Sequence, residues 1–355
     1  MPGLFDPVAL GALKLRNRIV MAPMTRSRAD EGDRPTELHV DYYAQRAEAG
    51  LIVSEGIHPS IVGKGYPRTP GLYDDSQVVA WRKVTDAVHA RGGTIVAQLM
   101  HVGRIAAEAN RPAGTDIVAP SAIPAKAKLW TATGMAGTMA PRALETDEIA
   151  GVVEEYAAAA GRAMAAGFDG VELHCTSGYL PAQFMATGTN RRSDRYGGSA
   201  ENRVRFPVEL LEALAARIGA ERVGFRICPG NPFNDLHDDD PFETHAELLD
   251  AIGGLGLAYC HLIEMATPQG VDHRGLAATH WHGPLIVNEG LDQAKAEALL
   301  AEGRADAIAF GRPFIANPDL VTRFREGHPL AEFDPTTLYA EGAKGYTDYP
   351  PFGGG

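Results

Sequence analysis

The sequence predicts an α/β fold, a (β/α)8 TIM barrel in a single domain covering residues 1–355. Eight short runs that are apolar almost throughout recur along the chain, and longer stretches with helical spacing separate them. Short strands that are apolar on both faces are typical of a parallel sheet covered by helices. A doubly wound sheet shares this alternation, but it would place a G-x-G-x-x-G turn after an early strand, and the chain has none. We therefore expect the barrel.

The predicted strands are too short for helices and contain few polar residues. They are Ile19–Thr25, Leu51–Gly56, Thr94–His101, Gly170–Thr176, Val223–Pro229, Tyr259–Ala266, Pro284–Gly290 and Ala307–Pro313. The predicted helices are amphipathic, and glycines follow several of them as C-terminal caps. They are Thr36–Ala49, Asp75–Arg91, Glu145–Gly167, Ala200–Gly219, Phe242–Gly254, Asp292–Gly303 and Asn317–Gly327. The helix before the seventh strand, Gly270–His282, has the weakest pattern.

Two segments fall outside the repeat. Leu4–Ile19 alternates apolar residues around Gly11, which predicts a hairpin that closes the N-terminal end of the barrel. Residues 102–143 follow the third strand and are rich in Pro, Gly and Ala. A loop of this length after a barrel strand overhangs the catalytic face, so we interpret it as a lid. A surface excursion without function is the alternative.

Composition and charge restrict the possible partners and the cellular location. The chain has 33 Lys+Arg and 45 Asp+Glu, a net charge of −12, which argues against nucleic acid or an anionic membrane as a partner. Three cysteines at long spacings exclude a disulfide framework and a four-cysteine metal or iron–sulfur site. No signal peptide or stretch of about 20 apolar residues is recognisable. We expect a cytoplasmic protein.

The ends of the last two predicted strands suggest an anion site. In barrels, phosphate groups often bind at the loops after strands seven and eight. Here these loops contain Gly290, Gly311 and Arg312. Glycine lets backbone N–H groups approach an anion, and the guanidinium fork matches phosphate oxygens. A tight turn and an arginine paired with a helix carboxylate would give the same pattern.

The fourth predicted strand ends in a cluster of groups able to carry protons. His174, Ser177 and Tyr179 lie within six positions at the catalytic face. All three can hydrogen-bond to a carbonyl oxygen, and tyrosine can also donate its proton. The alternative is a buried histidine whose hydrogen bonds are satisfied within the core.

Three further strands each carry one polar residue, Thr25, Gln98 and Arg226. A polar ligand in the barrel mouth would explain them together, and so would hydrogen bonds between strands. The stretch with Asp272, His273, His280 and His282 lacks regular ligand spacing, so we interpret these histidines as surface residues and predict no metal.

Several stretches carry a resemblance to a known family. They are LKLRNRIVMAPMTRSR (13–28), GYPRTPG (65–71), AQLMHVGR (97–104), GFDGVELHCTSGYL (167–180), NRRSDRYGGSAENRVR (190–205), the segment 224–229, GRPFIANPDL (311–320) and GYTDYP (345–350). With these stretches in order and nearly end to end, the sequence resembles the Old Yellow Enzyme family of FMN-dependent ene-reductases. Thr25, in place of a cysteine, resembles the classical branch of that family.

The resemblance implies FMN as cofactor and NAD(P)H as reductant. Residues lining the flavin would be Pro23, Met24, Thr25 and, through its backbone, Gly56. Gln98 and Arg226 would bind the pyrimidine edge, where Arg226 would stabilise negative charge on the reduced ring. Glu289, Gly290, Gly311 and Arg312 would hold the phosphate, Glu289 by its backbone N–H. These are expectations from similarity.

The implied substrate is an α,β-unsaturated carbonyl or nitro compound. Flavin N5 would deliver hydride to the Cβ atom of the substrate, His174 and Ser177 would bind its carbonyl oxygen, and Tyr179 would protonate Cα. Met100 and Tyr339 would complete the substrate pocket. Family members occur as monomers and homodimers, so either assembly is expected.

Several positions depart from the family pattern. Ser177 stands where Asn or His is usual, and a serine hydroxyl is shorter than an amide, so we expect it to reach the substrate oxygen through a water molecule. Met100 and Leu338 replace aromatic residues, which predicts a wider pocket, and Glu289 replaces a glycine. These changes leave two other functions open: an isomerase or desaturase on the same scaffold, or a flavin-binding protein with little turnover.

Overall fold

The computed structural model describes residues 2–354 and contains a closed barrel of eight parallel strands. Around the barrel the strands follow in the order β10, β11, β12, β13, β14, β3, β4 and β5, so every strand pairs with its two neighbours. Their bounds are β3 Ile19–Met21, β4 Leu51–Ile57, β5 Ile95–Leu99, β10 Gly170–His174, β11 Val223–Ile227, β12 Tyr259–Ile263, β13 Leu285–Asn288 and β14 Ala307–Phe310. The predicted fold class is confirmed.

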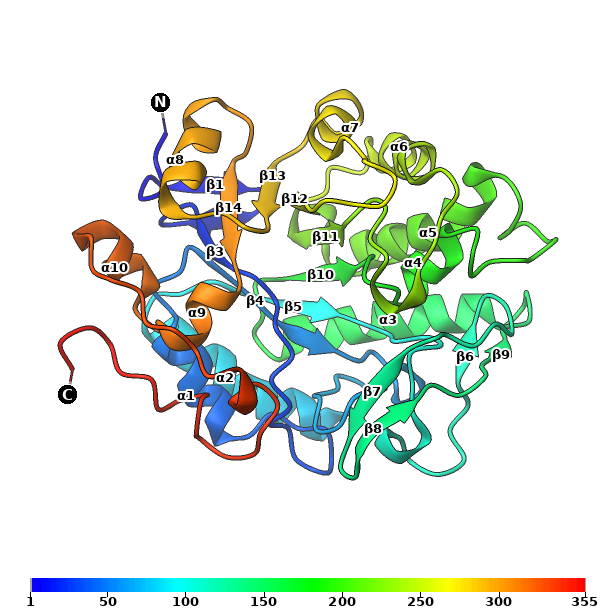
Figure 1. Cartoon of the computed structure of the whole chain (residues 1–355), viewed down its shortest axis with the longest axis horizontal. Helices are drawn as coiled ribbons and strands as arrows, with labels where there is room; N and C mark the ends of the chain where they lie inside the picture. Colours follow the sequence, from blue (N-terminus) through cyan, green and yellow to red (C-terminus); the bar gives the residue numbers. More distant parts are fainter. Residues whose placement is uncertain (1, 355) are drawn as a thin grey trace.

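Helices lie around the outside of the strands (Figure 1). Their bounds are α1 Glu37–Gln45, α2 Asp75–Ala90, α3 Ile149–Ala165, α4 Leu180–Met185, α5 Ala200–Ile218, α6 Pro241–Ile252, α7 His273–His280, α8 Gln293–Ala301, α9 Arg312–Ala316 and α10 Leu320–Glu326. Within residues 2–354, no helix is long and apolar enough to cross a membrane.

Alternation along the strands divides their side chains between two environments. Ile19, Ile52 and Ile95 belong to the large core that also contains residues of the surrounding helices. Their neighbours Val20 and Val53 belong to a separate cluster inside the barrel. Since successive strand residues point to opposite faces, both faces must be apolar at this level. This explains the continuous apolar runs in the sequence.

The N-terminal hairpin is confirmed as the strands β1 Val8–Leu10 and β2 Leu13–Leu15. Its leucines pack in the same cluster as the inward-facing strand residues. A Cβ atom on Gly11, which has φ +57°, would lie 2.4 Å from the carbonyl oxygen of Glu221 just before β11. The hairpin therefore closes the N-terminal end of the barrel and leaves its other end for a site.

The segment after β5 is long but not featureless. It contains the paired strands β6 Val118–Ala119 and β9 Arg142–Ala143 and the hairpin of β7 Lys128–Thr131 and β8 Gly134–Gly137. Figure 1 shows this hairpin projecting beside the barrel, away from β1. Whether it acts as a lid remains a prediction.

Most predicted strands were extended too far at their C-terminal ends. The strands predicted to end at Thr25, Thr176 and Pro229 end at Met21, His174 and Ile227. Arg312 and Pro313, predicted at a strand end, begin α9, since proline suits the first turn of a helix. Thr25 and Thr176, beyond the strand ends, leave the sheet and line cavities. Helix α4 was not predicted.

Candidate active site

Two adjoining cavities open at the C-terminal ends of the strands, and both are lined by Pro23 and Arg226. The larger has a volume of about 600 Å³ and the smaller about 360 Å³. Every predicted site residue lines one or both of them. The larger contains Thr25, Gly56, Gln98, Met100, His174, Ser177, Tyr179 and Tyr339. The smaller contains Met24, Glu289, Gly290, Gly311 and Arg312.

The smaller cavity has the features of an anion cradle. An added Cβ atom on Gly290 would meet nothing within 4 Å, and one on Gly311 would come no closer than 3.7 Å to the side chain of Met24. Backbone on these loops is therefore open to a ligand. Arg312, the first residue of α9, adds a guanidinium group. Glu289 has φ +101°, a conformation that favours glycine.

Gln98 lines the larger cavity and Arg226 lines both, and each side chain has a hydrogen-bond partner in the protein. The Gln98 amide donates to Glu172 Oε1 at 2.8 Å, and an Arg226 Nη atom donates to Asn288 Oδ1 at 2.7 Å. The Nε–H of Arg226 is buried without a protein acceptor. Hydrogen bonds between strands thus satisfy only some of the donors of Gln98 and Arg226. The Arg226 Nε–H remains free to donate to a ligand.

His174 and Tyr179 lie together on one wall of the larger cavity. Their ring centroids are 5.0 Å apart, and both side chains are at least nine-tenths buried. Burial and the nearby Arg226 lower the pKa of His174 to about 3, and burial raises the pKa of Tyr179 well above its usual value. Near neutral pH the imidazole is therefore neutral and the phenol keeps its proton.

Ser177 follows β10 in the left-handed region, with φ +58°. Its carbonyl oxygen accepts a hydrogen bond from the Asn234 amide at 2.8 Å, and the Asn231 amide approaches its hydroxyl at 3.5 Å. The backbone is thus held by a side chain of the loop after β11. Ser177 lines the larger cavity.

Sequence reasoning missed several polar residues of this cavity, among them Tyr66 and Asn234. The phenol of Tyr66 is 3.0 Å from that of Tyr179, and the two rings are nearly perpendicular. Asn234 has φ +60° and lies in the same cavity. Tyr66 belongs to the stretch GYPRTPG, which was noted for resemblance but not for a site role. Nothing in the local sequence marks Asn234.

The cavity mouth is lined by exposed apolar side chains. Trp130 and Met135 come from the β7–β8 hairpin, Phe233 from the loop after β11, and Tyr339 from the C-terminal segment. Leu338 does not line this cavity, and the wider pocket expected from its replacement of an aromatic residue stays a prediction. Its backbone carbonyl instead accepts hydrogen bonds from Arg26 and Arg28, which hold the C-terminal segment against the barrel.

Gly56 lies against the side chain of Met100. A Cβ atom added to Gly56 would be 2.7 Å from both Sδ and Cε of Met100. The glycine therefore makes room for a long side chain in the wall of the cavity, whether or not its backbone touches a ligand. Met100 itself is 4 % exposed, so it is packed and not loosely filling the pocket.

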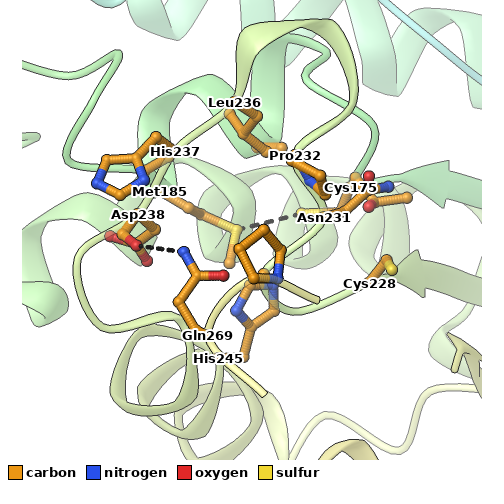
Figure 2. Close-up of a pocket in the computed structure, with 15 residues that line it drawn as sticks. Cys175, Met185, Cys228, Asn231, Pro232, Leu236, His237, Asp238, His245 and Gln269 are labelled. Atoms are coloured by element: carbon orange, nitrogen blue, oxygen red, sulfur yellow. Dashed lines mark hydrogen bonds between the residues drawn. The ribbon is translucent and has the colours of Figure 1, made fainter. Parts of the chain in front are cut away.

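A third cavity, of about 310 Å³, lies beside α4 and α6 (Figure 2). It contains Cys175 and Cys228, and His174, the neighbour of Cys175, lines the larger cavity instead. Burial raises the pKa of both thiols to about 12, so neither is an activated nucleophile. No predicted site residue lines this cavity.

The interpretation of His273 as a surface residue is wrong. His273 begins α7, is buried and hydrogen-bonds the carbonyl oxygen of Pro229 through Nε2 at 2.9 Å. His280 pairs with Asp250 at 2.9 Å. Among residues 2–354, no group of three or more His, Cys, Asp or Glu side chains is arranged to hold a metal ion.

Comparisons with known proteins agree with this geometry. Residues 3–331 match the model of the NADH:flavin oxidoreductase / NADH oxidase family. A protein of Leishmania infantum, named a probable flavin mononucleotide-dependent alkene reductase, is 41 % identical over 98 % of this chain and 97 % of its own length. The rice (Oryza sativa subsp. japonica) 12-oxophytodienoate reductase 1 is 40 % identical, covering 98 % and 92 %.

Solved structures of other proteins are also similar to this chain over nearly its whole length. Morphinone reductase superposes with a TM-score of 0.94 at 48 % identity, covering 98 % of this chain and 96 % of that one. A variant of it has been solved in complex with tetrahydroNAD. The old yellow enzyme homologue from Zymomonas mobilis also gives 0.94, at 41 % identity and with 98 % and 99 % coverage.

Proposed function

Because the chain belongs to the NADH:flavin oxidoreductase / NADH oxidase family, we propose that it is an FMN-dependent NAD(P)H oxidoreductase of the ene-reductase type. Its substrates are small molecules with an activated C=C bond, namely α,β-unsaturated carbonyl or nitro compounds. The named alkene reductase, 12-oxophytodienoate reductase and morphinone reductase among its relatives support this reaction class.

The observation that carries the proposal is the pair of adjoining cavities with different chemistry. One offers open glycine backbone and Arg312, which suits a phosphate, and the other offers a neutral imidazole and a protonated phenol. Arg226 lines both cavities, and its Nε–H has no acceptor in the protein. This donor suits an anionic or polar edge of a ring. These residues fit a flavin phosphate.

We assign the cofactor contacts as follows. Gly290, Gly311, Arg312 and the backbone of Glu289 hold the phosphate, and Gln98 and Arg226 hold the pyrimidine edge. Contacts to the ring come from Pro23, Met24, Thr25 and Gly56. The bound FMN supplies the hydride chemistry, which no side chain can supply.

The chain itself binds the substrate and moves one proton. His174 donates a hydrogen bond to the substrate oxygen, which stabilises the negative charge that develops there, and Ser177 assists. Tyr179 gives its proton to Cα, since its phenol is protonated at neutral pH. Met100 and Tyr339 bound the space for the substrate. The apolar mouth favours substrates with a hydrophobic body.

Purification and a turnover assay test this proposal. The protein should be yellow, release FMN on denaturation, and oxidise NADPH faster when 2-cyclohexenone is added. In the variants His174→Ala and Tyr179→Phe, the increase in NADPH oxidation on adding the enone should be lost. Reduction of the flavin by NADPH should be kept, which would support the assigned roles. A colourless protein that FMN does not reconstitute would overturn the proposal.

We also propose a cytoplasmic location and a monomeric or homodimeric assembly, as expected from the sequence. Size-exclusion chromatography with light scattering distinguishes the two assemblies. The isomerase or desaturase and the flavin-binding protein without turnover are not proposed, because the named relatives are reductases.

A further inference from the structure

A buried carboxylate lies beneath the candidate flavin site. Glu172, on β10, is 0 % exposed and lines neither cavity of the site. One of its oxygens accepts a hydrogen bond from Gln98 Nε2 at 2.8 Å. The other accepts from His261 Nδ1 at 2.9 Å and from the Tyr259 hydroxyl at 3.1 Å. Three donors from two other strands thus converge on one carboxylate.

The carboxylate is ionised and the imidazole is neutral. His261, Arg226 and the bond from Gln98 lower the pKa of Glu172 despite its burial. Burial lowers the pKa of His261, so its Nδ1–H acts as a neutral donor. Among the groups that lower the pKa of Glu172, Arg226 is the one that lines both cavities. A negative charge is therefore fixed behind the guanidinium that faces the site.

The barrel is built to hold this cluster. Glu172 is in register with Gln98 on β5 and with Gly224 on β11, and Arg226 is two residues beyond Gly224. A Cβ atom on Gly224 would lie 2.3 Å from Cζ of Tyr259, so the tyrosine ring fills the space that a side chain would take. The glycine lets the Tyr259 hydroxyl reach Glu172.

A buried charge of this kind is costly, since each desolvated ion loses several kcal/mol of hydration. Apolar side chains fill the layer of the barrel interior below Glu172. An apolar side chain at position 172 would avoid this cost. The two neighbours of Glu172 that face the cavity, Gln98 and Arg226, are the residues assigned to the pyrimidine edge. The charge of Glu172 therefore acts on both residues assigned to the pyrimidine edge.

We propose that Glu172 is a positioning residue that orients the Gln98 amide and lowers the reduction potential of the bound flavin by opposing the charge of Arg226. The inference rests on the proposed FMN site. Two-electron reduction with uptake of one proton leaves one negative charge on the ring. Arg226 stabilises that charge and the Glu172 carboxylate opposes it, so the oxidised form is favoured relative to a site with Arg226 alone.

Glu172→Gln tests the charge. The amide keeps the shape and an acceptor for Gln98 but removes the negative charge. The reduced form should then gain at least tenfold in affinity relative to the oxidised form. This ratio corresponds to a rise of about 30 mV for a two-electron couple. The potential of the holoenzyme is measured against a reference dye, without an enone substrate.

Tyr259→Phe is the matched control, since it removes one hydrogen bond to Glu172 and keeps the charge. Its ratio of affinities should stay within about twofold of the wild type. An FMN-loaded Glu172→Gln protein with the wild-type potential would overturn the charge effect. A wild-type chain that binds no FMN would instead overturn the proposed function.

Glu172→Asp tests the orientation, and it remains informative if the Gln variant does not fold. The carboxylate stays in the barrel, but the side chain is one methylene shorter, so the carboxylate lies farther from the Gln98 amide. Oxidised and reduced FMN should both bind more weakly, and by about the same factor. The reduction potential of the bound flavin should therefore change little. Unchanged affinity for oxidised FMN would overturn the role of Glu172 in orienting Gln98.

Discussion

The phenol oxygens of Tyr66 and Tyr179 lie 3.0 Å apart, with the rings of the two tyrosines nearly perpendicular. Burial raises the pKa of both phenols, so both remain protonated near neutral pH. One phenol must donate to the other. When Tyr179 gives up its proton to a substrate, Tyr66 can stabilise the phenolate that is left and pass a proton on.

Replacing these tyrosines should separate the two halves of the reaction. Tyr179→Phe removes the proton donor, so enone reduction by the reduced enzyme should slow by about 10²–10⁴-fold. Tyr66→Phe removes only the partner and should slow the same step by about tenfold. Stopped-flow absorbance measures each half-reaction, and reduction by NADPH should change little in both variants. A larger loss for Tyr66→Phe than for Tyr179→Phe would contradict these roles.

Ser177→Asn should increase enone reduction. The position has φ +58°, a conformation that asparagine adopts more readily than most residues, so the backbone should accept the change. The longer amide would add a donor for the substrate oxygen. Removing a well-placed donor of this kind lowers kcat by about 10²–10³-fold. Because the geometry of the new amide is not optimised, we expect a smaller gain in kcat, of about tenfold.

Ser177→Gly is the control for Ser177→Asn. Glycine relaxes the same backbone conformation but offers no side-chain donor. Steady-state kcat with 2-cyclohexenone should therefore rise for the asparagine variant alone. Equal gains in both variants would mean that backbone strain, and not the missing donor, limits the rate.

The fold could be predicted because its main signal is local. Alternation of side chains such as Ile95 and Val96 between the outer core and the barrel interior makes a strand apolar throughout, and that pattern is readable. The ends of strands were less readable. Thr25 and Thr176 continue apolar runs in the sequence, but they leave the ladder to line cavities. Nothing in the residue types marks where pairing stops.

The site could be predicted only where its residues lie at strand ends or in stretches that resemble the family. The partnership of Tyr66 with Tyr179 joins residues 113 positions apart, which no local pattern reveals. Glu172 offered a signal that was overlooked, since it is an acid within an apolar strand that is covered on both sides. His273 was misread because a histidine in a polar stretch gives no sign of burial.

Glu289→Gly should stabilise the protein and tighten FMN binding. Glu289 has φ +101°, and such a conformation costs a residue with a side chain on the order of 1 kcal/mol. The substitution should raise the melting temperature by a few degrees. It also removes a carboxylate from the cavity assigned to the phosphate, which should lower the Kd for FMN.

Glu289→Ala separates the two effects of Glu289→Gly. Alanine removes the charge but keeps a Cβ atom in the strained conformation. Both variants should bind FMN more tightly in fluorescence titrations, whereas only the glycine variant should gain stability without the cofactor. An alanine variant as stable as the glycine variant would contradict the role of backbone strain.

Buried neutral histidines should make the protein sensitive to acid. Burial lowers the pKa of His101 and His174 to about 3 and that of His245 to about 4, against about 6.5 in the unfolded chain. Between these values the unfolded state binds more protons than the folded state. The free energy of unfolding therefore falls as pH falls below about 6.5, by up to about 1.4 kcal/mol per pH unit for each histidine.

His245→Gln should reduce this dependence, because His245 lies outside the cavities assigned to cofactor and substrate. Urea unfolding at saturating FMN, at several values between pH 6.5 and pH 4.5, should give a slope that is smaller by up to about 1.4 kcal/mol per pH unit. His237→Gln is the control, since that ring is 62 % exposed, and its slope should match the wild type. Identical slopes for His245→Gln and the wild type would show that His245 takes up a proton in the folded protein. In that case its hydrogen bond from Nδ1 to the Pro241 carbonyl would outweigh its burial.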